Sequence, residues 1–470
     1  MGKNYIFIAA VLVIMLVPCI SMASSESSSV TESGEVSEAP SLYNEDGTLN
    51  LAYISEAGDY FSTQFGLRRE FVTANSYFED TVFHTSANDQ VIDGKDGWLF
   101  YTETLDDYTS ENLLSERGLN NIVHNIKLIQ DYAEAHGSIF LFTIAPNKNS
   151  LYGQYMPYYY LPGDEDNNYK RLEPKLQEAG IHYVNLFTLF QEQNEELYLK
   201  TDSHWNNKGA ALVFSELMDE TGLSYSNYKN MEYEYRQDTE GDLSSMLFPD
   251  GVRQEENIYY LHDTKFSYVN DVTDNMDDWI ETTGGENDAI LLMYRDSFGE
   301  SLLPFFADEF SEAYFSRLLP YNLTNVITYK PDVVILERAE RRIPGFAESA
   351  AVMQMGINPA YLDDAKDIFE TEFNLSNGLP LEIKNDQATL NVTENGDYYI
   401  FSGRVSEDII GDDENIYLSL ITSEGTSAVY DAFRISFDDG GQRNDNGYSL
   451  YLLKDSIDPA VNHVKLSVNC

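Results

Sequence analysis

Three side chains of this sequence could together supply a nucleophile, a base and a carboxylate that orients the base. Ser297 follows the apolar run 289–294 and precedes a helix-like run, so its hydroxyl is expected at a turn from a buried strand into a helix. Asp202 and His204 stand two positions apart, and an extended backbone places both side chains on one side. A carboxylate in that place can hold an imidazole in one tautomer, as serine-dependent acyl transfer requires.

Each of these residues also has a plainer interpretation. Serine commonly caps the first turn of a helix, and at the position of Ser297 capping is the more frequent duty. Asp202 or Ser203 could cap a helix that starts near Asn206, which would leave His204 an ordinary surface residue. A metal site is a third interpretation, but the stretch lacks His-Glu-x-x-His or paired-cysteine spacing. We therefore predict neither a metal nor a cofactor.

Several aromatic, amide and basic side chains near these motifs are candidates for binding a substrate. Trp205 directly follows His204 and could wall the site or stack on a sugar. The loop 146–149 could help to stabilise an oxyanion. The alternative for Arg341 is an ion pair with a glutamate of its own run, ERAERR. Besides Trp205, the candidate substrate-binding residues are Asn147, Lys148, Arg295, Arg317 and Arg341.

The middle of the chain alternates between short apolar runs and helix-like patterns. Strands that alternate with helices favour an α/β fold with a mainly parallel sheet, in which ligands bind beyond the carboxyl ends of the strands. The expected buried strands are 139–145, 182–187, 289–294 and 332–337, and the expected helices are 111–135, 207–219 and 299–309.

The last hundred residues have a different pattern, with alternating runs separated by turn-rich segments. Short strands at this spacing predict a β-sandwich, and its aromatic residues could either bind a glycan or fill its core. We expect a boundary within 355–380 and a sandwich domain over 371–470. The expected strands are 388–393, 397–404, 415–422, 427–434, 448–453 and 463–468.

The first 23 residues are typical of an export signal. Lys3 precedes an apolar run over 5–17, and Ser21 and Ala23 provide small residues for cleavage after position 23. Lipidation of Cys19 or an uncleaved anchor are the alternatives. Residues 24–45 are rich in Ser and Glu, and this composition predicts a disordered tether. We therefore expect a protein that works outside the cytoplasm, either secreted or tethered to the cell surface.

The charge of the chain excludes one class of partner. Its 470 residues include 79 acidic and 29 basic side chains, which gives a formal net charge of −50. A nucleic-acid partner needs a basic footprint, so no nucleic acid is expected. A hydrophobic content of 43% argues against disorder for most of the chain.

Four motifs stand in order along the chain: GKDGWLF at 94–100, PNKN at 146–149, TDSHW at 201–205 and DSF at 296–298. Together, over roughly 50–345, they resemble those of the alginate O-acetyltransferase-like group of exported SGNH hydrolase-type proteins, which includes the DHHW proteins of Gram-positive bacteria. Two positions depart from the family pattern: Ser203 stands where DHHW proteins have His, and Arg295 where SGNH hydrolases usually have Gly.

The resemblance implies a fold, a triad and two partners. The fold would be an SGNH-like three-layer α/β/α domain over 46–355, and the triad would be Ser297, His204 and Asp202. The implied activity is O-acetyl transfer to a polysaccharide or wall polymer outside a bacterial cytoplasm, with a membrane-bound acyltransferase as acetyl donor. The alternatives are an acetyl or carbohydrate esterase with the same triad and a non-catalytic glycan-binding scaffold. The net charge of −50 favours a neutral or cationic acceptor over a polyanion such as alginate.

Overall fold

The computed structural model describes most of the chain beyond position 38. The described residues are 39–469, except 45, 46, 65, 84, 164, 165, 355, 358–361, 363, 364 and 375–377, together with 5, 8, 11, 12, 16, 17 and 21. Most of the predicted export signal and of the predicted tether therefore lie outside the described residues. Within the described part, no helix combines the length and apolar character that crossing a bilayer requires.

The chain divides into two compact units. The smaller unit consists of residues 1–102, 200–202 and 240–255. The larger unit consists of residues 103–199, 203–239 and 256–470, and it contains both the central sheet and the C-terminal strands.

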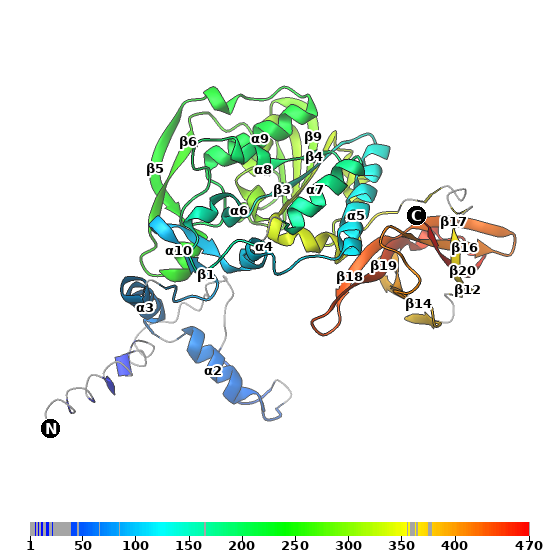
Figure 1. Cartoon of the computed structure of the whole chain (residues 1–470), viewed down its shortest axis with the longest axis horizontal. Helices are drawn as coiled ribbons and strands as arrows, with labels where there is room; N and C mark the ends of the chain where they lie inside the picture. The colour runs from blue at the N-terminus through cyan, green and yellow to red at the C-terminus, as the bar shows by residue number, and fades with distance from the viewer. Residues whose placement is uncertain are drawn as a thin grey trace. The chain divides into compact units, whose positions relative to one another are not determined.

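A seven-stranded sheet forms the centre of the larger unit (Figure 1). Strands β4, β3, β11, β9 and β10 are parallel neighbours, and β8 and β7 continue the sheet in antiparallel orientation. The inner strands are buried on both faces, which explains their continuous apolar runs. In sheet order, the strands are β4 (Tyr183–Val184), β3 (Ile139–Ala145), β11 (Val333–Ala339), β9 (Asn287–Tyr294), β10 (Phe310–Ser316), β8 (Trp279–Thr283) and β7 (Ser267–Tyr268).

Helices cover this sheet and complete the predicted three-layer α/β/α arrangement. Helices α5 (Glu116–Ala135) and α7 (Asn168–Glu178) share one apolar core with β3. Helix α9 (Asn207–Thr221) also contacts β3, and its Phe214 packs on Phe306 of α11 (Leu303–Glu309) with ring centroids 5.0 Å apart. Shorter elements of this unit are α4 (Leu105–Thr109), α6 (Lys148–Tyr152), α12 (Thr324–Tyr329) and the 3-10 segment η6 (Glu340–Ala347).

Two predicted elements differ from the structure. The predicted strand over 182–187 ends after Val184, and helix α8 (Leu186–Gln191) begins because the Asn185 side chain accepts a 3.0 Å hydrogen bond from the Thr188 amide. The predicted helix over 299–309 is divided into the 3-10 turn η5 (Ser297–Glu300) and α11. Pro304 stands in the first turn of α11, where its missing N–H costs no helical hydrogen bond.

The C-terminal part of the larger unit is β-rich, as predicted. A four-stranded sheet (β12–β20–β16–β17) and a five-stranded sheet (β13–β14–β15–β19–β18) supply one apolar core. The predicted strand 427–434 is divided into two by Ala432, and β12 and β13 were not predicted. The strands are β12 (Lys366–Glu372), β13 (Leu381–Lys384), β14 (Ala388–Asn395), β15 (Tyr398–Val405), β16 (Asn415–Thr422), β17 (Gly425–Asp431), β18 (Phe433–Asp438), β19 (Arg443–Leu453) and β20 (Val461–Asn469).

The smaller unit is built around a short antiparallel hairpin of β1 (Val91–Asp93) and β2 (Leu99–Tyr101). Helix α10 (Asp242–Leu247) packs on both strands and on α3 (Arg68–Phe83), and α2 (Tyr53–Gln64) precedes α3 in the chain. The apolar core of this unit consists of Val91, Leu99, Leu243, Leu247 and Phe248. Strands β5 (Tyr233–Glu240) and β6 (Gln254–Tyr260) stand in the chain on either side of the segment that contains α10, and most of their residues belong to the larger unit.

Candidate active site

The structure brings Ser297 and His204 into contact, although 92 residues separate them in the chain. Ser297 Oγ lies 2.8 Å from His204 Nε2, which is hydrogen-bond distance. Ser297 opens η5 just beyond the carboxyl end of β9, and His204 lies just before α9. Both side chains are half-buried, so solvent still reaches them. An imidazole nitrogen this close to a hydroxyl can take its proton when the oxygen attacks a carbonyl.

The turn that presents Ser297 is held by two carboxylates. Asp296 Oδ1 accepts a 2.9 Å hydrogen bond from the Phe298 amide, and Asp296 Oδ2 accepts a 2.8 Å hydrogen bond from the Ala339 amide. Glu337 Oε2 accepts a 3.1 Å hydrogen bond from the Asp296 amide. The end of β9 is therefore fastened to the end of β11, and this fixes the direction in which Ser297 points.

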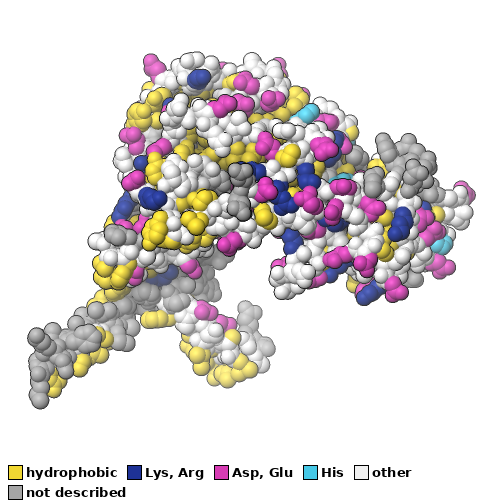
Figure 2. All heavy atoms as spheres, viewed as in Figure 1, with side chains coloured by type: hydrophobic (Ala, Val, Ile, Leu, Met, Phe, Trp, Pro, Cys, Tyr) yellow, Lys and Arg dark blue, Asp and Glu magenta, His cyan; other side chains and the backbone are white. Residues whose placement is uncertain are grey.

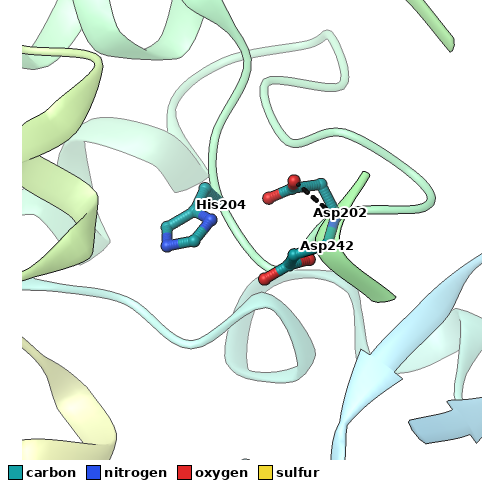
Figure 3. A group of neighbouring side chains, drawn as sticks. All are labelled: Asp202, His204 and Asp242. Carbon is teal, nitrogen blue, oxygen red and sulfur yellow. Dashed lines mark hydrogen bonds between the residues drawn. The ribbon is translucent and has the colours of Figure 1, made fainter. Parts of the chain in front are cut away.

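Asp202 belongs to the smaller unit, where its carboxylate is held in place. Its Oδ2 atom accepts a 2.9 Å hydrogen bond from the Asp242 amide at the start of α10 (Figure 3). The preceding residue is fixed as well, because the amide and hydroxyl of Thr201 each donate a 2.8 Å hydrogen bond to Glu255 Oε2. The orienting role of Asp202 toward His204 stays a prediction, which rests on their spacing in the chain.

The ring of Phe298 lies close to three of the residues that the sequence analysis predicted for the site. The His204 and Trp205 rings each lie 4.8 Å from it between centroids, and the Arg341 guanidinium lies 5.7 Å over its face. Trp205 is only 1% exposed, and its indole N–H donates a 2.6 Å hydrogen bond to Ser301 Oγ. In this structure Trp205 therefore supports the site from within.

Asn147 and Lys148 are buried, and both use their side chains to hold the chain around the site. Asn147 Nδ2 donates a 2.9 Å hydrogen bond to Asp107, and Asn147 Oδ1 accepts a 3.3 Å hydrogen bond from the Arg341 amide. Lys148 Nζ donates a 3.0 Å hydrogen bond to the Leu199 carbonyl. The substrate-binding role of these residues stays a prediction.

Arg295 and Arg317 both bind backbone carbonyls of one loop. Arg295 donates to the Asn275 carbonyl, and Arg317 donates to the Met276 carbonyl. Burial, assisted by the positive charge of Arg317, lowers the pKa of Arg295 to about 10. The two arginines hold the loop before β8, and their substrate-binding role also stays a prediction.

Two buried glutamates support the site, and the sequence analysis did not single them out. Glu340 Oε2 accepts hydrogen bonds of 2.8 Å from the Asn147 amide and 2.7 Å from Ser150 Oγ. Burial raises the pKa of Glu340 to about 8, and the nearby Asp107 adds to this effect. Burial and then Asp296 raise the pKa of Glu337. Their position at and just beyond the carboxyl end of a buried strand was the one signal in the sequence.

Two arginines of the same run have partners that precede this run in the chain. Arg338 Nη1 donates a 3.0 Å hydrogen bond to the Tyr321 hydroxyl, and Arg341 Nε lies 3.8 Å from the Glu103 carboxylate.

Part of this chain matches the model of a known family. Residues 91–278 match the family described as "SGNH hydrolase-like domain, acetyltransferase AlgX". The probable alginate O-acetylase AlgJ of Pseudomonas syringae pv. tomato is 25% identical over 174 residues, which are 36% of this chain and 42% of the relative. The probable alginate O-acetylase AlgJ of Pseudomonas aeruginosa is 25% identical over 169 residues, 36% of this chain and 41% of that protein. The chain thus spans less than half the length of the curated relatives it matches.

This chain is also similar to several solved structures. A DHHW family protein from Eubacterium siraeum has 15% identity, a TM-score of 0.41, and coverage of 54% of this chain and 91% of its own. Bacillus cereus PatB1 has 15% identity, a TM-score of 0.43, and coverage of 55% and 97%. The family match confirms the resemblance predicted from the motifs, and the matched family is one of SGNH-type acetyltransferases. The matched segment includes Asp202 and His204. Ser297 lies beyond that segment, and the structure places it beside His204.

Proposed function

We propose that this protein is an exported, serine-dependent O-acetyltransferase that moves an acetyl group onto a hydroxyl of a cell-surface polysaccharide or wall polymer. The observation that carries the proposal is the 2.8 Å contact between Ser297 Oγ and His204 Nε2. It occurs in a chain of which residues 91–278 match an acetyltransferase family. A serine hydroxyl becomes a nucleophile when a base stands beside it, and His204 is in the position of that base.

The proposed reaction has two halves. In the first, His204 Nε2 takes the hydroxyl proton of Ser297 while Ser297 Oγ forms a bond to the acetyl carbonyl carbon. The bond from that carbon to the donor then breaks, and the donor leaves with the proton held by His204. In the second half, His204 removes a proton from the acceptor hydroxyl, whose oxygen attacks the acetyl ester, and Ser297 leaves with that proton.

Asp202 is the proposed orienter of His204. The two residues are separated by one position, so their Cα atoms lie within about 7 Å of each other in any conformation. The Asp202 carboxylate is itself held by the Asp242 amide at 2.9 Å. A fixed carboxylate would keep the imidazole in the tautomer whose Nε2 accepts a proton, and it would stabilise the imidazolium that forms.

An acetyl esterase with the same residues is the second candidate. Ser297 and His204 are only half-buried, so water can reach the position that an acceptor hydroxyl would take. The chemistry is the same in both cases, and the identity of the acceptor decides between the two activities.

The decisive variant is Ser297→Ala, tested for hydrolysis of a small chromogenic acetyl ester by the purified protein. We expect a loss of at least about a thousandfold in kcat, because the nucleophile is removed. Ser267→Ala is the matched control, since Ser267 is an exposed serine of the edge strand β7. Full activity in Ser297→Ala would refute the proposal.

Asp202, His204 and Asp242 (Figure 3) have side chains of types that bind divalent metals, so the assay is repeated with EDTA.

A second assay separates the transferase from the esterase. Adding an uncharged oligosaccharide to wild-type protein and acetyl ester should yield acetylated sugar, detected by mass spectrometry. Faster release of free acetate, without acetylated sugar, would instead identify an esterase.

The proposal also includes where the protein acts, what supplies the acetyl group and how the chain divides into domains. Processing after Ala23 would release the chain outside the cytoplasm, where a membrane-bound acyltransferase would supply acetyl groups. The proposed catalytic domain spans 46–355, and the proposed glycan-binding sandwich spans 371–470. N-terminal sequencing of protein collected from the culture medium or the cell surface tests the export step.

A further inference from the structure

The chain that leaves helix α6 contains a run of tyrosines that the proposed mechanism does not use. Five of the ten residues 152–161 are tyrosine, and we call this run the tyrosine segment. Within it Tyr158 is 83% exposed and Tyr159 is 53% exposed, and the nearby Leu161 is exposed as well. Large aromatic side chains that stay in solvent as a group mark a surface that binds a partner.

The turn that carries the exposed pair is held in place by the backbone. The Tyr160 amide donates a 3.1 Å hydrogen bond to the carbonyl of Pro157, which is buried. Farther along, the Gly163 amide donates a 2.8 Å hydrogen bond to the Tyr108 carbonyl. A ligand that binds a turn already fixed in this way loses less free energy to ordering the protein.

The exposed rings are arranged so that a ligand can pack on them. The Tyr158 and Tyr159 ring centroids lie 5.4 Å apart with their planes at 79°, an edge-to-face contact. Such a contact covers at most one face of one ring, so each ring keeps a face outside it. A tyrosine face packs on the apolar side of a pyranose, and the hydroxyl at its rim exchanges hydrogen bonds with sugar hydroxyls.

The tyrosine segment and Ser297 belong to the same unit and follow strands that end at the same edge of the central sheet. Strands β3, β11 and β9 are parallel neighbours, so their carboxyl ends meet at that edge. Ring contacts connect the two places, because the Tyr198 ring lies 5.6 Å from the Tyr152 ring and 6.2 Å from the Phe298 ring. A polymer bound along this edge can therefore reach both the tyrosine segment and the proposed nucleophile.

The charges along this part of the chain select against an acidic sugar. Residues 149–169 include three acidic side chains, at 164–166, and no Lys or Arg. The Tyr155 hydroxyl also donates a 2.9 Å hydrogen bond to the exposed Glu196 carboxylate. A uronate would meet repulsion from these carboxylates, whereas an uncharged sugar would meet none.

We propose that Tyr158 and Tyr159 form a platform on which an uncharged glycan stacks as the acceptor of the acetyl transfer proposed above. This inference rests on the proposed function, because it names the acceptor class of the same enzyme and the surface that holds it.

The test measures glycan binding by isothermal titration calorimetry with the whole purified protein. The probes are hexasaccharides of β-1,4-linked mannose, β-1,4-linked N-acetylglucosamine and β-1,4-linked mannuronate. The mannose and mannuronate probes differ only in the carboxylate at C6 of each unit. We expect at least one uncharged probe to bind, and the mannuronate probe to bind at least about tenfold more weakly than that probe.

The variants change the exposed rings and leave the buried residues alone. Tyr158→Ala combined with Tyr159→Ala should weaken binding of the uncharged probe at least about tenfold, because both ring faces are lost. Tyr158→Phe combined with Tyr159→Phe keeps the ring faces, so it should bind at least about threefold more tightly than the double alanine variant. The matched control is Tyr43→Ala, which should bind as wild type does, since Tyr43 is 57% exposed and belongs to the smaller unit.

Four outcomes would overturn the inference: no binding of either uncharged probe, wild-type affinity in the double alanine variant, no gain in the double phenylalanine variant over it, or mannuronate binding as tight as that of the uncharged probes. Ser297→Ala should bind glycan as wild type does, because the inference concerns the platform. Binding by the Ser297→Ala protein therefore separates this inference from the proposed function, which the ester assay tests independently.

Discussion

At the scale of single residues, the site depends on carboxyl groups that are buried with defined partners. Glu340 is 2% exposed and accepts hydrogen bonds from the Asn147 amide and from Ser150 Oγ. Because burial raises its pKa to about 8, this glutamate is protonated in the folded protein at a pH where it is ionised in the unfolded chain. Its protonation is therefore coupled to folding.

This coupling predicts how stability changes with pH. Between the ordinary glutamate pKa of 4.5 and the raised pKa of about 8, the folded state holds a proton that the unfolded state has released. The free energy of unfolding should therefore fall as pH rises through that window. The fall attributable to this group is at most about 1.4 kcal/mol per pH unit. Glu340→Gln removes the titration, so its stability should decline less steeply than that of wild type. Denaturant unfolding between pH 5 and pH 8.5 measures both slopes.

The control for this prediction is Glu178→Gln, which changes an exposed glutamate at the end of α7. Its slope should match the wild-type slope. Parallel curves for wild type and Glu340→Gln would show that Glu340 does not titrate in this window.

The sequence predicted that Ser297 and His204 would lie together, but not which residues support them. Ser297 and His204 were predicted because each stands in a motif whose chemistry can be recognised locally. The sequence does not indicate that Glu340 and Ser301 form hydrogen bonds that support the site. The Glu340 side chain meets Asn147 only because β11 pairs with β3, and such a contact between distant parts of the chain has no local signature.

At the scale of elements, a strand was predicted correctly where an apolar run is bounded on both sides by residues that commonly end a strand. The run 139–145 is apolar except for Thr143 and stands between Gly137 and Pro146, and the observed strand β3 has the predicted bounds. The prediction failed at 182–187, where apolar residues continue from β4 into α8. A short apolar run has no periodicity that separates a strand from a buried helix, so the cap at Asn185 decides the outcome.

The packing of α5 on the C-terminal sheet gives an element-scale prediction. Asn125 on α5 is 1% exposed, and its Nδ2 donates to the Phe346 and Arg434 carbonyls at 2.9 and 2.8 Å. Its Oδ1 accepts a 2.8 Å hydrogen bond from the Arg434 amide. Asn125→Leu would leave three backbone groups without these partners, so the free energy of unfolding should fall by about 2–4 kcal/mol. Denaturant unfolding followed by circular dichroism measures the change.

Asn230→Leu is the matched control, because Asn230 is exposed on a short 3-10 turn and should change stability little. An unchanged free energy of unfolding in Asn125→Leu would mean that the Asn125 hydrogen bonds do not stabilise the fold.

At the scale of the whole molecule, the net charge of −50 acts on any charged acceptor before it reaches the site. Figure 2 shows acidic side chains scattered over the displayed face, with basic side chains in smaller groups. A polyanionic glycan approaching such a surface meets repulsion that salt can screen, whereas an uncharged glycan meets none.

The rate of the proposed acetyl transfer should therefore depend on salt in a way that identifies the acceptor. With mannuronate oligomers the initial rate should rise as salt increases from ~0.01 to ~0.1 M, since the screening length shortens from ~30 to ~10 Å. With an uncharged oligosaccharide the rate should stay constant over the same range. A rate that falls with salt for mannuronate would reveal a local basic groove that overcomes the net charge.

The two oxygens of Asp296 have a consequence for how this domain can change over time. One oxygen serves the turn that carries the nucleophile, and the other serves the end of a strand 43 positions later. Selection on this aspartate would therefore act on the assembly of the sheet as well as on the proposed reaction. A descendant of this domain without the proposed activity would be free to lose its serine, but it would still need the aspartate beside it. In such lineages the aspartate would mark the position of the former nucleophile.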